Sequence, residues 1–251
     1  MALAHDRGTA LTSCLAHATR QWRVVYETLA DELSRNVYRM GEKLPSEQEA
    51  AARFGVSRNT IRRALLLLSQ EGRIRILNGA GSFAACKDIL YEIDATSRFS
   101  DTLAQYGAEP RRTVLNWSIL QANETTARSL ELPSGATVVE IVSLMCSRDL
   151  PLVLARRCYP NDLVPDLVER YEAERSITRV FADAGLGQLK RLETAVSARL
   201  PTPEEAETLA MPSNSPVLVA HGVGKLTTGR MAEVNVSVVP AHLVRFKFRN
   251  V

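Results

Sequence analysis

The chain has 251 residues, 45% of them hydrophobic, and a formal net charge of +3 at pH 7. This length is enough for two hydrophobic cores, so we expect two domains. No run of eighteen or more apolar residues occurs, and residues 1–20 lack the basic-then-apolar pattern of a signal peptide. The sequence therefore excludes membrane-spanning and exported classes and indicates a cytoplasmic protein.

The first elements of the chain are expected to be a flexible tail over residues 1–20 and a helix over residues 21–36. The apolar face of that helix comprises Val24, Val25, Leu29 and Leu33. This face can complete a small core with the two helical patterns that follow.

A helix-turn-helix pattern occupies residues 44–70. Ser46 and Glu49 have the S-x-x-E spacing of a capping box, so a helix is expected to begin there. Gly55 can adopt the positive φ that ends this helix, and Ser57 can cap the next one. The second helix has an apolar stripe at i, i+3, i+4 and i+7, formed by Ile61, Ala64, Leu65 and Leu68. Its outward-facing residues are therefore Arg58, Asn59, Arg62 and Arg63.

These outward side chains indicate a recognition helix, because arginine and asparagine can bond bidentately to guanine and adenine in the major groove. The alternative is an ordinary helical hairpin with a solvated basic face. A β-hairpin follows directly, with strands over residues 73–77 and 82–84 and a turn at Asn78-Gly79. The hairpin favours the first interpretation, since it completes a winged helix over residues 21–86.

Basic residues gather in the same part of the chain. Residues 20–86 contain eleven Lys and Arg against seven Asp and Glu, whereas residues 87–251 contain nineteen against twenty. We therefore expect only the first domain to meet DNA phosphates.

The segments KLPSEQEAAARFGVSRNTIRRAL and GRIRILNGAGSFA resemble the N-terminal domain of the GntR family of bacterial transcription regulators. The resemblance implies a protein that binds double-stranded DNA. It assigns DNA contacts to Ser46, Gln48, Ser57, Arg58, Asn59, Thr60, Arg62 and Gly79. Gln48 stands where many members carry arginine, so one base contact is expected to be weaker or different.

The rest of the chain contains an internal repeat at a spacing of 79 residues, because LELPS at residues 130–134 is echoed by LAMPS at residues 209–213. Each copy is expected to fold as strand, short helix, strand, strand. The expected strands cover residues 111–120, 136–147 and 151–159, and then 191–200, 216–227 and 230–239. Tight connections at residues 148–150 and 228–229 make the last two strands of each copy antiparallel hairpins.

The six strands are expected to form one mainly antiparallel sheet. Helical patterns over residues 98–106, 162–171 and 175–184 must cover it, which makes an α+β domain over residues 94–251. Two related halves that meet across a sheet leave a cleft where a small molecule can bind. Residues 87–93 are expected to be a short linker between the domains.

Residues 94–251 resemble the UTRA effector domain of the HutC subfamily of GntR regulators, whose fold is similar to chorismate lyase. Segments around residues 98–107, 197–201 and 214–218 look like those of the PhnF regulators of phosphonate uptake and breakdown. The resemblance implies a small-molecule effector, with a phosphonate or another phosphorylated or anionic metabolite as the candidate. Arginines that many UTRA domains carry are absent at Leu144–Cys146 and Val239–Ala241, which puts a shared anion contact in doubt.

Other polar groups are therefore candidates for the effector site, because guanidinium groups suit phosphate and phosphonate oxygens. Only one of Arg156 and Arg157 can face the cleft, and Glu233, Asn235 and Ser237 share one strand face. Arg157 also stands where a PhnF-like chain is expected to carry histidine. The candidates are Arg98, Ser100, Arg157, Tyr159, Glu233 and Ser237. For each of them the alternative is a surface pair or a solvated strand face.

Cysteine and histidine spacing indicates neither a structural metal, a disulfide framework nor a cofactor. The residues concerned are Cys14, Cys86, Cys146, Cys158, His5, His17, His221 and His242. Cys146 and Cys158 lie inside apolar strand patterns and are interpreted as small core residues.

The sequence thus predicts a homodimeric, sequence-specific transcription regulator, since a symmetric dimer reads two half-sites about 10 base pairs or a multiple apart. Repression is implied by the resemblance alone. The alternatives are a HutC-type regulator of a different metabolite, a lyase-like enzyme and a purely structural DNA-binding protein. Fold similarity does not transfer chemistry, and the sequence offers no nucleophile motif, metal cluster or P-loop.

Overall fold

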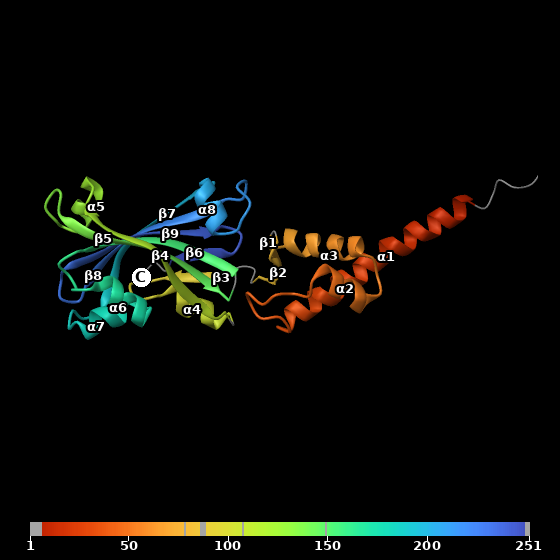
Figure 1. The fold of residues 1–251 in the computed structure, drawn as a ribbon, viewed down its shortest axis with the longest axis horizontal. Helices are drawn as coiled ribbons and strands as arrows, with labels where there is room; N and C mark the ends of the chain where they lie inside the picture. The colour runs from red at the N-terminus through yellow and green to blue at the C-terminus, as the bar shows by residue number, and fades with distance from the viewer. Residues whose placement is uncertain (1–6, 78, 86–88, 107, 149, 249–251) are drawn as a thin grey trace, which may run out of the picture. The chain divides into compact units, whose positions relative to one another are not determined.

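The computed structural model describes residues 7–77, 79–85, 89–106, 108–148 and 150–248, with side chains described from residue 21 onward. The chain divides into two compact units, residues 1–87 and residues 88–251 (Figure 1). Within the described part of the chain, no helix combines the length and the apolar character needed to cross a bilayer.

The N-terminal unit contains three helices and a β-hairpin. They are α1 (Arg7–Ser34), α2 (Glu47–Phe54), α3 (Arg58–Gln70), β1 (Ile74–Leu77) and β2 (Gly81–Ala84), and the two strands pair antiparallel. The expected tail is wrong from Arg7 onward, because α1 begins there. Residues 9–34 contain neither proline nor glycine and several alanines, so nothing in them interrupts a helix. Residues 1–6 lie outside the described residues.

One hydrophobic core holds this unit together. Val25 and Leu29 of α1 pack with the stripe of α3 and with Ile74 of β1. The stripe predicted for α3 is confirmed, since Ile61, Ala64, Leu65 and Leu68 are its buried residues. Val24 was expected on the same apolar face as Val25 but is 54% exposed. Neighbouring helical residues point about 100° apart, so α1 turns only one of the two valines to the core.

The C-terminal unit is built on one antiparallel sheet with the strand order β4-β5-β6-β9-β8-β7. The first half supplies β4 (Pro110–Gln121), α5 (Glu124–Ser129), β5 (Thr137–Ser147) and β6 (Leu150–Pro160). The second half supplies β7 (Leu189–Arg199), α8 (Pro203–Thr208), β8 (Val217–Leu226) and β9 (Met231–Pro240). The predicted repeat and six-stranded sheet are confirmed, and the two halves meet where β6 pairs with β9.

Helices lie on both faces of this sheet. Figure 1 shows α4 (Phe99–Gln105), α6 (Leu167–Glu174) and α7 (Ile177–Asp183) on one side and α5 and α8 on the other. The core under α6 and α7 includes Tyr159 and Phe181, whose rings meet edge-on with centroids 5.9 Å apart. The helix expected over residues 162–171 begins later, because Pro165 disfavours helical conformation in the residue before it.

A second, two-stranded sheet joins β3 (Ile89–Ile93) to β10 (Val244–Phe248) in parallel. β3 occupies most of the range expected as a linker, so that prediction is wrong for residues 89–93. The reason is apolar alternation, since Ile89 and Tyr91 are buried while the residues between and after them are less so. This pair fastens the two ends of the C-terminal unit to each other.

Cys146 and Cys158 are half-buried and do not lie in the core, contrary to expectation. Cys158 pairs in register with Glu140, and its Sγ lies 3.8 Å from that carboxylate. Burial, with the nearby Glu140, raises the pKa of the Cys158 thiol to about 11. Strand alternation thus turns the Cys158 thiol toward the Glu140 carboxylate. Cys14 and Cys86 lie outside the residues whose side chains are described.

Candidate DNA-binding helix and effector pocket

The turn between α2 and α3 is held by the residues that the sequence pattern singled out. Gly55 ends α2 with φ of 64°, and Ser57 Oγ accepts a hydrogen bond from Thr60 N at 3.2 Å. The capping box is present, with Ser46 N donating to Glu49 Oε2 at 2.8 Å and Glu49 N donating to Ser46 Oγ at 3.3 Å. The capping box thus fixes the start of α2, and the Ser57–Thr60 bond fixes the first turn of α3.

The four side chains predicted to face outward from α3 are exposed, as the buried stripe requires. Arg62 is held by Glu47, the first residue of α2, through Nε–Oε1 and Nη2–Oε2 hydrogen bonds of 2.8 and 2.7 Å. Arg58 Nη2 lies 3.6 Å from the same carboxylate, and Arg63 stacks on the Trp22 ring at 4.5 Å. The hydrogen bonds from Arg62 hold the pKa of Glu47 below its usual value. Sequence reasoning missed Glu47, because no local pattern pairs one helix of the motif with the other.

The remaining predicted contact residues also lie on exposed parts of this unit. Gln48 is exposed beside Glu47 on α2. Ser57 and Thr60 have their hydroxyl oxygens 2.9 Å apart at the start of α3. Gly79 is exposed next to the hairpin turn with φ of 76°, and a Cβ there would meet no atom within 4 Å. The backbone conformation, not space, therefore calls for glycine. Asn78 lies outside the described residues, and contact of these residues with DNA stays a prediction.

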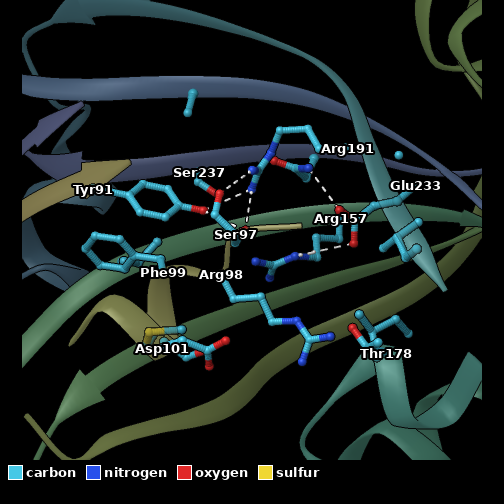
Figure 2. A pocket seen from close by; sticks show the side chains of 18 of the residues that line it. Tyr91, Ser97, Arg98, Phe99, Asp101, Arg157, Thr178, Arg191, Glu233 and Ser237 are labelled. Carbon is cyan, nitrogen blue, oxygen red and sulfur yellow. Dashed lines mark hydrogen bonds and ion pairs between the residues drawn. The ribbon is translucent and has the colours of Figure 1, made fainter. Parts of the chain in front are cut away.

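A pocket of about 450 Å³ lies on the face of the large sheet that carries α4, α6 and α7 (Figure 2). Both halves of the repeat contribute to it, together with β3, α4 and α7. Its lining contains two carboxylates, Asp101 and Glu233, against seven arginines. The arginines are Arg98, Arg111, Arg112, Arg157, Arg175, Arg179 and Arg191. The pocket is therefore strongly cationic.

Five of the six effector candidates line this pocket: Arg98, Ser100, Arg157, Glu233 and Ser237. Tyr159 lies fully buried behind the wall, where its hydroxyl donates to Glu233 Oε2 at 2.8 Å. Burial, with the adjacent Glu233, raises the pKa of Tyr159 well above its usual value, so its hydroxyl stays a donor at neutral pH. Whether these residues bind a ligand stays a prediction.

Strand alternation separates the two neighbouring arginines of β6. Arg157 faces the pocket, where its Nε lies 3.7 Å from Glu233 Oε2 and its Nη1 donates to Ser143 Oγ at 3.2 Å. Arg156 is exposed and pairs with Glu140 at 2.7 Å. Figure 2 shows Arg98, the N-cap residue of α4, and Arg157 of β6 reaching into the same space.

Five pocket arginines were missed, namely Arg111, Arg112, Arg175, Arg179 and Arg191, and two of them make hydrogen bonds inside the unit. Arg191, on β7, donates to the carbonyl of Asp94 at 2.7 Å, to Ser97 Oγ at 3.1 Å and to the Tyr91 hydroxyl at 3.0 Å. Arg112, on β4, donates to the Tyr171 hydroxyl at 3.0 Å. The two positions are related by the 79-residue spacing of the repeat, and that signal was available in the sequence.

Comparison with known proteins decides the family. Residues 22–83 match the sequence model of the bacterial regulatory proteins of the gntR family, and residues 105–245 match that of the UTRA domain. The chain belongs to the GntR family and carries a UTRA domain. The family resemblance and the fold class stated from the sequence are confirmed.

The relatives are transcription regulators. The chain is 28% identical over 228 residues to the probable transcriptional regulator PhnF of Escherichia coli (strain K12), over 88% of this chain and 93% of that protein. It is 28% identical over 199 residues to the histidine utilization repressor of Klebsiella aerogenes, over 78% and 80% of the two chains. The crystal structure of PhnF from Mycobacterium smegmatis shares the fold, with a TM-score of 0.62 at 23% identity over 90% of this chain and 99% of that chain. This GntR-family protein is thus a DNA-binding transcription regulator.

Proposed function

We propose that this protein is a sequence-specific repressor whose UTRA pocket binds a small anionic metabolite, a phosphonate or a phosphorylated compound, and that binding releases DNA. The supporting observation is the pocket charge, with seven arginines against two carboxylates. Guanidinium groups form forked, charge-assisted hydrogen bonds to phosphate and phosphonate oxygens. Repression also draws on the name of the histidine utilization repressor, and the phosphonate class draws on the resemblance to the PhnF regulators. The proposal places the protein in the cytoplasm, where its operator lies.

Base reading is assigned to the start of α3, lying in the major groove. Arg58 has a side chain that is 63% exposed, and Asn59 beside it is exposed as well. Arg58→Ala is expected to lose about 1 to 3 kcal/mol of specific binding, the contribution of a good bidentate base contact. Gel-shift titration at fixed salt, on DNA from upstream of the protein's own gene, measures this loss. The matched control is Arg128→Ala, which removes an exposed arginine of α5 that pairs with Glu124. Unchanged operator binding by the Arg58 variant would refute the base-reading role.

The proposal includes a homodimer formed through the UTRA unit. Apolar side chains on the edge strand β4 are exposed, with Leu115 at 48%, Trp117 at 44% and Ile119 at 57%. A row of exposed apolar residues along a sheet edge is typical of an interface. A symmetric dimer would also present two recognition helices to two half-sites. Size-exclusion chromatography with light scattering is expected to give the mass of two chains, and a monomer at micromolar concentration in the presence of DNA would contradict it.

The effector class is tested by release of operator DNA. Phosphonates, phosphate monoesters and simple carboxylates are added at equal ionic strength to the protein–DNA complex. Release by a phosphonate or phosphate monoester supports the proposal. Release by an uncharged compound alone would instead favour a HutC-type regulator of a different metabolite.

A further inference from the structure

Arg112 is a largely buried guanidinium of the pocket that leaves most of its donors unused among the described residues. Arg112 and Arg191 hold equivalent positions in the two repeats, and both line the pocket. Arg191 is fully engaged with β3 and the segment after it, through hydrogen bonds to Tyr91, Asp94 and Ser97. Arg112 makes one hydrogen bond among the described residues, to the Tyr171 hydroxyl. A guanidinium carries five N–H donors, so Arg112 keeps several for a ligand.

The surroundings of Arg112 favour an anion. Burial and the nearby charge of Arg157 lower the pKa of Arg112. The buried carboxylate of the pocket, Glu233, is already engaged by Arg157 at 3.7 Å, by Tyr159 at 2.8 Å and by Asn235 at 2.9 Å. Glu233 is thus the counter-charge of Arg157, whereas the groups that act on the buried Arg112 are Arg157 and two tyrosines. A buried charge without its own counter-charge is costly, and a bound anion removes that cost.

We propose that Arg112 is the principal anion-binding residue of the pocket and that a tetrahedral oxyanion, the phosphate or phosphonate group of the effector, docks between Arg112 and Arg157. This inference rests on the proposed effector binding and deepens it. The organic part of the ligand lies toward the aromatic wall. That wall is formed by Tyr91 with Phe99, whose ring centroids are 5.1 Å apart (Figure 2), and with Phe246 at 5.9 Å. A cavity of about 450 Å³ suits a small metabolite.

The test compares the full chain with three variants in the absence of DNA. Arg112→Gln removes the charge, and Arg112→Lys keeps the charge but loses the forked geometry. Arg156→Gln is the matched control, because it removes an exposed arginine charge from strand β6 of the same sheet. The probes are inorganic phosphate, methylphosphonate and acetate, exchanged for chloride at constant ionic strength. Affinity is measured by calorimetry and by the rise in unfolding temperature.

The native chain and Arg156→Gln are expected to bind phosphate and methylphosphonate alike. Arg112→Gln is expected to bind both anions at least about tenfold more weakly, because it loses one or more charge-assisted hydrogen bonds. The affinity of Arg112→Lys is expected to lie between those of the native chain and Arg112→Gln. Native-like phosphate affinity of Arg112→Gln would overturn the inference, and so would absence of phosphate and methylphosphonate binding by the native chain. Tighter binding of acetate than of methylphosphonate would overturn the tetrahedral class.

If Arg112→Gln does not fold, the affinity of Arg112→Lys tests the inference. Native-like affinity of Arg112→Lys for phosphate would show that the forked guanidinium geometry has no role. No DNA takes part in these measurements. A failure here therefore leaves the proposed DNA binding standing, whereas a failure of operator binding leaves the anion result intact.

Discussion

Glu47 is the counter-charge of two arginines on α3, the proposed recognition helix. It accepts two hydrogen bonds from Arg62 and lies 3.6 Å from Arg58 Nη2, so one carboxylate holds two of the guanidinium groups that face outward from α3. Glu47→Gln removes that counter-charge. We expect the variant to bind non-specific DNA more tightly, because at least one guanidinium becomes available to a phosphate.

The size of the effect follows from the geometry. Each added phosphate contact steepens the dependence of log affinity on log salt by about 0.9. The fold itself should lose little, since an exposed ion pair contributes about 0.2 to 1 kcal/mol and the Arg62 side chain is 54% exposed. Discrimination between operator and random DNA should fall, because phosphate contacts carry no sequence information.

Fluorescence anisotropy with labelled operator and random duplexes, across a range of salt concentrations, measures both quantities. Glu27→Gln is the matched control, since Glu27 is an exposed carboxylate of α1 in the same unit. A salt slope for Glu47→Gln equal to that of the control would refute the view that Glu47 restrains the two arginines.

Two further predictions concern the UTRA unit. Glu205 takes hydrogen bonds of 2.6 and 2.7 Å from Arg199, which hold its pKa below the usual 4.5. Because the folded-state pKa is depressed, the stabilisation is present above about pH 4.5 and is lost as the pH falls through the folded value. Glu205→Gln should therefore lower the free energy of unfolding in urea by about 0.5 to 1 kcal/mol at pH 7, and by less at pH 3. An equal loss at pH 7 and pH 3 would contradict this. Trp117→Ser should weaken self-association, seen as a rise in the dimer dissociation constant by analytical ultracentrifugation, and an unchanged constant would place the interface elsewhere.

Local patterns predicted the large sheet because each of its hairpins is short and each strand alternates. The pairing of β3 with β10 left no such signal, because the two strands are far apart in the sequence. Glu92 of β3 and Lys247 of β10 lie 155 positions apart, although they form an ion pair of 2.7 Å in the structure. Parallel strands are not joined by a tight turn, so no turn motif in the sequence indicates their pairing. Apolar residues before the expected domain boundary were therefore interpreted as a linker.

The outward face of α3 was predictable because one helix and its stripe define it. The pocket was only half predictable. Alternation within a strand allowed only one of Arg156 and Arg157 to face the cleft, and the structure shows that it is Arg157, but alternation says nothing about the neighbouring strand. Arg112 on β4 pairs in register with Met145, in the stretch of β5 where an arginine was noted as missing. Cross-strand register, which the sequence alone does not fix at this edge, brings that cation to the pocket.

The short parallel ladder between β3 and β10 also gives the pocket a wall from both ends of the C-terminal unit. Tyr91 sits in the middle of β3, opposite Phe246 on β10, and its hydroxyl accepts a hydrogen bond from Arg191. Both aromatic side chains line the pocket. A ligand bound there would therefore meet the first and the last described strand of this unit at the same time.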